Sequence, residues 1–277
     1  RMLGLGPMKH RCRVIAIHGA KGGVGATTIS VNLAVALQKL TGERVALVDS
    51  SLQTGDVGVS MNIVGGAGID DLIPNLNELD ADLFDRVLFS HQSGVKVLLA
   101  PRDVERSDSI GADEMRRIIT VLSQLFDYIV VDTPATLDGA SIAVLDYCDH
   151  VVLVTTPDVI SLKNAGRFLQ LSRRLGYPAD KVVLAVNRAG ITQSVPLPEV
   201  ERNLGRKPVA VVPMALDAFM KAANRGETLT TTRSWRGPSR SLYKLAESLA
   251  LNTKVKAKSG RSLLGRRPGE AQPAPAQ

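Results

Sequence analysis

Short, nearly continuous apolar runs alternate along this chain with longer segments whose apolar residues recur at helical spacing. The runs, rich in Val, Ile and Leu, occupy 13–17, 44–49, 95–101, 126–134, 151–157, 182–187 and 208–213. Helical spacing marks 29–40, 112–126, 139–147, 159–175, 196–204 and 239–251. Strands of a parallel sheet are apolar throughout because both faces of the sheet are covered. The pattern therefore predicts an α/β fold, a doubly wound, mostly parallel sheet of about seven strands with helices on both faces.

The pattern stops at both ends of the chain, and this sets the expected domain boundaries. Residues 1–11 carry no periodic segment and are expected to be a disordered lead-in or linker. Residues 12–251 are expected to form one domain. Residues 252–277 are basic and rich in Pro and Ala, and we expect a mobile tail there.

Net charge is concentrated at one end of the 277 residues. The chain carries +7, but ten Lys and Arg against two Asp and Glu lie between residue 233 and the end. The body before them is close to neutral, so its charge does not indicate a DNA-binding face, and DNA is an unlikely partner. Two cysteines, no apolar run long enough to span a bilayer and no signal-peptide pattern favour a cytoplasmic location.

A glycine-rich turn connects the first predicted strand to the first predicted helix. Glycines allow successive backbone N–H groups to face one concavity, and the positive end of the following helix adds to the attraction for phosphate. The Thr27 hydroxyl stands where a phosphate-bound Mg²⁺ needs an oxygen ligand. The turn thus predicts a site for a di- or triphosphate with Mg²⁺; the alternative is a turn without a ligand. The binding residues expected are Gly22, Gly23, Val24, Gly25, Ala26, Thr27 and Thr28.

The sequence KGGVGATT resembles the deviant Walker A loop of the MinD/ParA family of P-loop NTPases, whose pattern is K-G-G-x-G-K-[ST]-[ST]. The resemblance implies that Lys21 reaches across an ATP-bound homodimer to the partner's phosphates and acts in catalysis there. The second lysine of the pattern is replaced by Ala26. That replacement removes one charge-assisted contact, worth on the order of 1.5–3 kcal/mol, so we expect ATP binding to be weakened but retained.

Acidic residues follow two of the predicted strands. The resemblance implies that Asp49 and Asp132 lie near Mg²⁺, with Asp132 in the Walker B segment. Family members usually carry D-x-D where this chain has Asp49-Ser50-Ser51, so Ser51 occupies a degenerate water-positioning site. Taken singly, each acid could equally be a solvated strand end. With Ala26 and Ser51 both substituted, we expect weak or no ATP hydrolysis, which leaves the classification as an ATPase enzyme open.

Three later residues complete the expected nucleotide site. Asn187 and Arg188 resemble the adenine-side segment of the family, and Pro213 lies where the backbone flanks the base. A cap or turn residue after a strand is the equal alternative for Asn187.

Several segments resemble the CpaE/TadZ branch, MinD-like proteins of Flp/Tad pilus assembly. They are SLQTGD, GVKVLLAPRD, LFDYIVVDTPATLD, VTTPDVISLKNA and AVNRAG. This implies a nucleotide-dependent dimer switch in pilus assembly or localisation, with a secretion ATPase or other polar machinery as partner. It also implies that a receiver-like domain often precedes such a chain. The alternatives are an active ATPase in septum-site placement or DNA partitioning, and a scaffold that binds no nucleotide.

The basic tail offers a possible membrane contact. Six cations lie within 254–267, and near an anionic bilayer each contributes up to about 1 kcal/mol. Gly260, Gly265 and Pro268 interrupt any helix there, so a solvated tail is the favoured alternative. A peripheral position at the inner face of the cell membrane or at a pole is the corresponding expectation.

Overall fold

The computed structural model describes residues 12–192, 194–231 and 237–250. Its centre is an eight-stranded sheet with the strand order β3-β4-β2-β5-β1-β6-β7-β8. All neighbouring strands pair in parallel except β3, which runs antiparallel to β4 at one edge. The strands are β1 (Arg13–Gly19), β2 (Val45–Asp49), β3 (Phe89–Ser90), β4 (Lys96–Leu98), β5 (Tyr128–Thr133), β6 (His150–Thr155), β7 (Val182–Ala189) and β8 (Ala210–Pro213).

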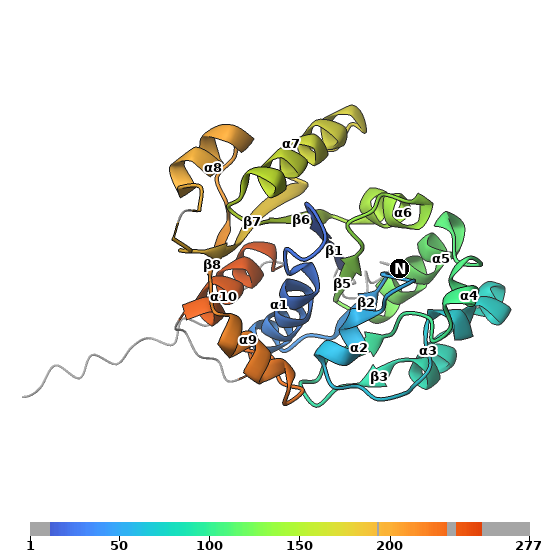
Figure 1. The fold of residues 1–277 in the computed structure, drawn as a ribbon. Coiled ribbons are helices and arrows are strands. Elements are labelled where there is room, and N and C mark those ends of the chain that lie inside the picture. The colour runs from blue at the N-terminus through green and yellow to red at the C-terminus, as the bar shows by residue number, and fades with distance from the viewer. Residues whose placement is uncertain (1–11, 193, 232–236, 251–277) are drawn as a thin grey trace, which may run out of the picture.

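Helices cover both faces of the sheet (Figure 1). One face packs against α1 (Ala26–Thr41), α2 (Asp56–Ser60) and α10 (Gly237–Leu249). The other packs against the 3-10 segment η1 (Ile69–Glu78) and against α3 (Ala81–Val87), α5 (Ala112–Leu125), α6 (Gly139–Tyr147), α7 (Val159–Arg174) and α8 (Leu197–Leu204). The short helices α4 (Val104–Ser107) and α9 (Leu216–Ala223) complete the described elements.

Two separate apolar cores result from the alternation of side chains along each strand. Val14 and Ala16 of β1 point into the core beneath α5, α6 and α7, whereas Ile15 and Ile17 point into the core beneath α1 and α10. All four are buried. Successive strand residues face opposite sides of a sheet, so a strand covered on both sides must be apolar throughout. This is why the doubly wound prediction from continuous Val, Ile and Leu runs is confirmed.

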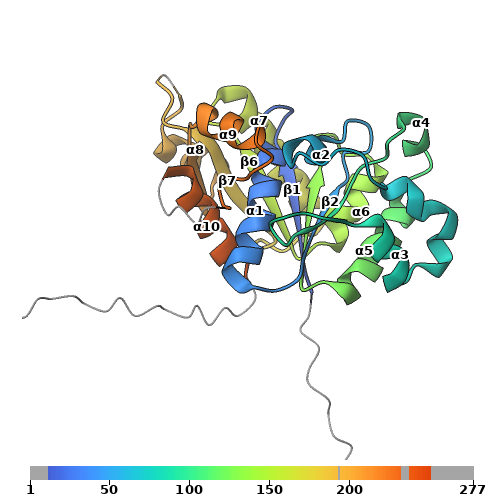
Figure 2. The same ribbon diagram turned by 90° about the horizontal axis from the view of Figure 1, so that it is seen from below.

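The carboxyl ends of the parallel strands meet at one edge of the sheet. In Figure 2 the loop after β1 and helix α2 lie side by side at this edge, and α1 and α2 pack against each other. β1 lies between β5 and β6, while the next strand in sequence, β2, lies on the far side of β5. Ligands of open α/β sheets bind at such a reversal of strand order.

The elements between β2 and β4 and after β8 differ from the sequence prediction. The prediction of about seven strands omitted β3, whose two residues are too few for a detectable run. Helices α2, η1, α3, α4 and α9 were also not predicted; they are short, and η1 contains Pro74 and a non-helical Asn75. The final helix spans Gly237–Leu249 instead of 239–251. The predicted lead-in at 1–11 and the tail at 252–277, with its 254–267 segment, lie outside the described residues.

In the described part of the chain, no helix combines the length and apolar character needed to cross a bilayer.

Candidate functional site

A cleft of about 800 Å³ opens at the carboxyl edge of the sheet, between the loop after β1 and the loops after β2 and β5. Its walls are built from four stretches of chain that are far apart in sequence. They are residues 19–28 with Arg188, residues 51–60 in part, residues 107–111 in part, and residues 133–140 in part.

The loop after β1 has a backbone conformation that glycine adopts readily and other residues do not. Gly23 and Gly25 have φ angles of +77° and +89°, a left-handed conformation that costs other L-residues roughly 1–2 kcal/mol. The Ala20 N–H donates to the Val154 carbonyl of β6 at 2.8 Å and anchors the start of the loop. At its far end Gly25 passes directly into α1 as the N-cap. The loop is therefore a preformed turn at a helix N-terminus, the arrangement that binds phosphate.

Asn187 fixes the same loop from β7. Its side-chain amide nitrogen donates to the Val24 carbonyl at 2.8 Å, and its side-chain oxygen accepts the Arg188 N–H at 2.9 Å. A Cβ at Gly25 would lie 2.5 Å from that amide nitrogen. Both polar atoms of the Asn187 side chain are thus engaged inside the protein, which makes Asn187 a support of the glycine loop. The predicted contact with adenine stays a prediction.

Thr27 and Asp132 meet at the start of α1. The Thr27 hydroxyl donates to Asp132 Oδ2 at 2.7 Å, and the Ser30 hydroxyl donates to Asp132 Oδ1 at 2.6 Å. Asp132 is almost completely buried at the end of β5. The sequence analysis predicted Thr27, Asp49 and Asp132 near Mg²⁺, and the structure brings Thr27 and Asp132 together in a hydrogen bond. Their role toward the metal stays a prediction. Ser30, one helical turn further along α1, was missed because a serine within an apolar helix gives no distinct signal.

Asp49 lies beside Asp132 in the register of β2 and β5. It is fully buried, and its two oxygens accept backbone N–H groups, from Ser51 at 3.1 Å and from Val57 at 3.0 Å. Asp49 therefore ties down both ends of the loop at 51–57. Its carboxylate does not form part of the cleft wall as the described residues build it.

Burial makes both carboxyl groups weaker acids. Desolvation, together with the nearby charge of Asp132, raises the pKa of Asp49 to about 7 in spite of its two backbone N–H partners. Desolvation also raises the pKa of Asp132 to about 6, opposed by the hydroxyls of Ser30 and Thr27. A cation that favours the ionised forms would stabilise this pair, as a bound divalent ion does.

Lys21 is held by its own chain. Its ammonium lies 3.2 Å from Asp158 Oδ1, and the two side chains are 35% and 43% exposed. Asp158 also accepts the Thr156 hydroxyl at 2.5 Å and caps α7 by accepting the Ser161 N–H at 3.0 Å. Burial would raise the pKa of Asp158, but these hydrogen bonds and Lys21 outweigh it, so that pKa is lowered. An ion pair this exposed contributes at most about 1 kcal/mol, so a phosphate group can replace Asp158 as the partner of Lys21.

A second cleft, of about 610 Å³, continues from the first past the glycine loop and Arg188 toward Asp158 and residues 191, 192, 194 and 195. Arg188 has a φ angle of +56° and lines both clefts. Pro213 ends β8, next to β7, and is absent from the described walls of both clefts. The adenine-side roles of Arg188 and Pro213 stay predictions.

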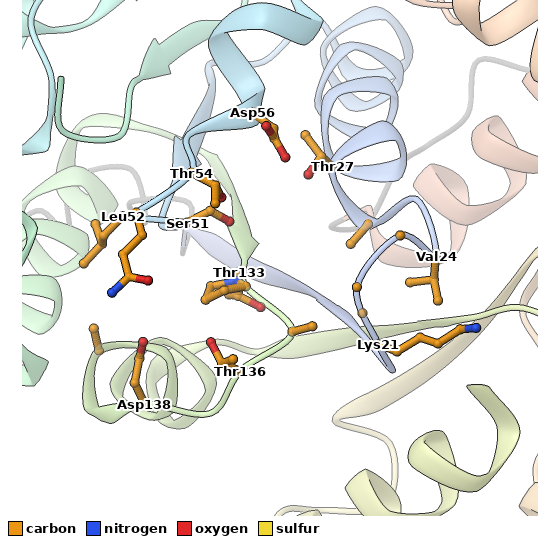
Figure 3. A pocket seen from close by; sticks show the side chains of 18 of the residues that line it. Lys21, Val24, Thr27, Ser51, Leu52, Thr54, Asp56, Thr133, Thr136 and Asp138 are labelled. Carbon is orange, nitrogen blue, oxygen red and sulfur yellow. The ribbon is translucent and has the colours of Figure 1, made fainter. Parts of the chain in front are cut away.

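Figure 3 shows the wall opposite the glycine loop. Asp56, at the start of α2, and Thr27, at the start of α1, point toward one another across the cleft, and Ser51 lies deeper on the same wall as Asp56 (Figure 3). Lys21 points away from them, to the other side of the loop (Figure 3). The sequence prediction missed Asp56 as a site residue. The available signal was the Gly55-Asp56 pair at the end of SLQTGD, which follows a predicted strand.

The residues present fit a nucleotide phosphate chain with a divalent cation. A Cβ placed on Gly22 or Gly23 would meet no atom within 4 Å, so the backbone of this loop lies open to a ligand. The Thr27 hydroxyl is available as an oxygen ligand if it leaves Asp132. Among the described residues no group of three or more His, Cys, Asp or Glu could hold a metal ion alone. Mg²⁺ would thus be held with the help of phosphate oxygens and water, and Thr27, Asp49 and Asp132 stay the residues predicted to hold it.

A parallel sheet, a glycine loop and a helix that begins at the loop define the class as a P-loop NTPase fold. A family model described as an AAA domain, AAA_31, matches residues 12–177. An uncharacterized ATP-binding protein of Methanocaldococcus jannaschii is 33% identical over a region that covers 64% of this chain and 65% of that protein. The septum site-determining protein MinD of Thermotoga maritima is 28% identical over a region that covers 77% of this chain and 79% of that protein. The antiactivator FleN of Pseudomonas aeruginosa is 31% identical over a region that covers 76% of this chain and 72% of that protein.

Solved structures agree with this assignment. A ParA family ATPase from Chlorobium tepidum has a TM-score of 0.80 at 26% identity, covering 87% of this chain and all of that one. MinD from Pyrococcus horikoshii, solved with Mg-ADP, has a TM-score of 0.77 at 22% identity and covers 89% of this chain and 99% of its own. This likeness concerns the fold alone. The chain belongs to this AAA-domain family, within the MinD/ParA group of P-loop ATPases.

Proposed function

We propose that this protein binds Mg·ATP and uses it as a switch for homodimer formation, with slow hydrolysis. The observation that carries the proposal is the glycine loop, which is preformed by Gly23, Gly25 and the Asn187 contact even though the loop lysine is replaced by Ala26. Backbone N–H groups and the N-terminus of α1 do not depend on that side chain. In the related MinD from Pyrococcus horikoshii the bound group is Mg-ADP, which supports the same class of ligand here.

Dimer formation would require Lys21 to change partners. In the single chain its ammonium is 3.2 Å from Asp158. In the proposed dimer it leaves Asp158 and contacts the nucleotide phosphates of the second copy, a stronger charge-assisted pairing than an exposed ion pair. Nucleotide would thereby be linked to association, because each bound ATP presents the anion that the partner's Lys21 needs.

Slow hydrolysis follows from two substitutions in the same cleft. Ala26 removes a cation that neutralises charge developing on the transferred phosphoryl group, and a cation in such a position is worth roughly 10³–10⁵ in rate. Ser51 cannot accept a proton from water as a carboxylate does. Mg²⁺, when bound, would neutralise charge on the phosphate oxygens.

Within this activity, we propose a role in the assembly or localisation of Flp/Tad-type pili, with a secretion ATPase or other polar machinery as partner. The CpaE/TadZ-like segments, among them SLQTGD and GVKVLLAPRD, support this role. The switch would act from the cytoplasm, at the inner face of the membrane or at a pole. Repeated hydrolysis in septum-site placement or partitioning is the second candidate, favoured by the MinD relative that aligns over 79% of its length.

The test measures ATP binding, size and turnover separately. Calorimetry with Mg·ATP is expected to show binding in the micromolar range or weaker, and light scattering is expected to show a doubling of mass with Mg·ATP. Absence of both heat and association contradicts the switch and leaves a nucleotide-free scaffold. Fast steady-state turnover favours the septum or partition ATPase.

A matched pair of variants tests the role of Lys21. Lys21→Ala is expected to retain ATP binding within roughly tenfold, since it removes one charge-assisted contact, but to lose the mass increase. Lys207→Ala removes an exposed lysine that lies outside both clefts, and it should leave association unchanged. Association of Lys21→Ala equal to that of the wild type excludes the proposed contact across the dimer.

A further inference from the structure

Three carboxylates approach the start of α1, and two of them are already engaged. Asp132 accepts the hydroxyls of Thr27 and Ser30 with its two oxygens. Asp49 accepts the backbone N–H groups of Ser51 and Val57 and is fully buried. Both carboxylates are almost completely buried, each of their oxygens already accepts a hydrogen bond, and neither residue lines the cleft as the described residues build it.

The third carboxylate, that of Asp56, is exposed on the cleft wall. Among the described residues it has no hydrogen-bond or ion-pair partner for its side chain. It points across the cleft toward Thr27, the residue next to the glycine loop (Figure 3). Asp108 and Asp138 also line this cleft, but Asp138 caps α6 by accepting the Ser141 N–H at 2.8 Å, and Asp56 is the aspartate that Figure 3 labels beside Thr27. Asp56 is therefore the carboxylate expected to meet a phosphate chain bound in the loop.

The position of Asp56 is fixed by the loop that precedes it. Gly55 adopts a φ angle of +57°, and a Cβ there would lie 3.1 Å from Ala100 Cβ, so glycine is needed for this turn. The Gly55 N–H donates to the Ser51 carbonyl at 2.9 Å, and the Val57 N–H donates to Asp49 Oδ2 at 3.0 Å. Residues on both sides of Asp56 are thus held by hydrogen bonds, which aims its side chain into the cleft.

The charge of Asp56 acts on both buried carboxyl groups, Asp49 and Asp132. Its charge contributes to the raised pKa of both Asp49 and Asp132, after the larger effect of burial.

We propose that Asp56 is the carboxylate that orients and deprotonates the attacking water, in place of the acid that Ser51 lacks. The inference rests on the proposed binding of Mg·ATP. In the step, the water oxygen forms a bond to the γ-phosphorus while the bond from that phosphorus to the β–γ bridging oxygen breaks. ADP leaves with the electron pair of the broken bond, and the water proton passes to Asp56 and then to solvent. The products are ADP, inorganic phosphate and one released proton.

The experiment is a single-turnover measurement with radiolabelled ATP, which detects slow hydrolysis, combined with calorimetric ATP binding. A positioned general base contributes roughly 10²–10⁴ in rate, and because a serine and water remain we expect Asp56→Asn to lower the rate at least about tenfold. The dissociation constant for Mg·ATP is expected to stay within about threefold, because asparagine preserves the shape of the side chain.

Two further variants separate chemistry from folding. Asp82 is an exposed aspartate in the first turn of another short helix, α3, and Asp82→Asn is expected to hydrolyse ATP at the wild-type rate. Adding Ser51→Asp to Asp56→Asn is expected to restore turnover, since a carboxylate returns to the same cleft wall, a recovery that repair of folding alone does not explain.

Each outcome has a distinct meaning. Absence of ATP binding in the wild type overturns the proposed function itself. Binding without detectable turnover, or turnover in Asp56→Asn equal to that of the wild type, overturns the role of Asp56 and leaves the switch intact. Loss of turnover that Ser51→Asp does not recover also counts against Asp56 as the water-positioning group.

Discussion

The two strand-to-helix turns of the cleft look alike but work differently. The loop after β1 ends in Gly25 and leads into the 16-residue helix α1, and the loop after β2 ends in Gly55 and leads into the five-residue helix α2. Both glycines have positive φ. The first loop leaves its backbone open at Gly22 and Gly23, where a Cβ would meet no atom within 4 Å. In the second, the backbone is tied to the buried Asp49, and side chains face the cleft.

This difference determines what each substitution costs. In the first loop the function is carried by the backbone, so replacement of a lysine by Ala26 removes one contact and leaves the rest of the site. In the second loop the function is carried by side chains, so replacement of an acid by Ser51 removes the chemistry unless another carboxylate, such as Asp56, takes its place. Binding is therefore the more robust property and hydrolysis the more fragile one.

The largest effect should come from the backbone of the first loop. Gly25→Ala places a Cβ 2.5 Å from the Asn187 amide nitrogen at a φ angle of +89°. The conformation alone costs roughly 1–2 kcal/mol, and the clash adds the loss of the Asn187 contact, so we expect affinity for Mg·ATP to fall by about a hundredfold or more. Calorimetry measures this directly.

Gly176→Ala is the matched control for that variant. Gly176 also has a positive φ, +75°, but its Cβ would meet nothing within 4 Å and it lies outside both clefts. It should lower thermal stability while leaving ATP affinity unchanged. If Gly25→Ala binds ATP as the wild type does, the backbone of the first loop is not the binding element.

An intermediate effect is expected from restoring the lysine of the first loop. Ala26→Lys should tighten Mg·ATP binding by roughly ten- to hundredfold, because one charge-assisted contact returns. Ala26→Met, with a side chain of similar length and no charge, should not tighten it. A gain of the same size in both variants would assign the effect to packing and contradict the electrostatic account of Ala26.

The smallest effect concerns pH and is confined to the acids near the second loop. The folded-state pKa values of Asp49 and Asp132 are about 7 and about 6, above the value of about 3.9 for an unfolded chain. The folded state thus retains protons that the unfolded state releases. This stabilising contribution is complete below pH 4 and is lost as pH rises through 6 and 7.

We therefore expect the free energy of unfolding of the nucleotide-free protein to fall by about 1–2 kcal/mol between pH 6 and pH 7.5, as measured by urea unfolding. Asp132→Asn should flatten this dependence. It removes one titrating group and one negative neighbour of Asp49, while the hydroxyls of Thr27 and Ser30 can reorient to pair with an amide. An unchanged slope in Asp132→Asn would show that other groups cause the dependence.

Much of the fold was predictable from the sequence because the signals are local. Apolar runs marked β1, β2, β4 to β8, and the helical spacing at 139–147 matched α6 residue for residue. The glycine loop, and Thr27 and Asp132 as candidate site residues, were named from short motifs that follow strands, whereas the hydrogen bond between Thr27 and Asp132 came from the structure. The edge strand β3 and the helices between β2 and β4 could not be predicted in this way, because their few residues carry no full period of a pattern.

By itself, then, the sequence determined the doubly wound sheet, the glycine loop, and the presence of Ala26 in that loop and of Ser51 in the loop after β2, since each follows from the order of neighbouring residues. Only the tertiary structure decided that Lys21 is held by Asp158, that Asn187 supports the glycine loop, and that Asp56 faces Thr27. The first two are contacts between residues more than a hundred positions apart, and the third depends on how two loops approach at the edge of a sheet. Such proximity is set by the packing of the whole domain, which no local pattern records.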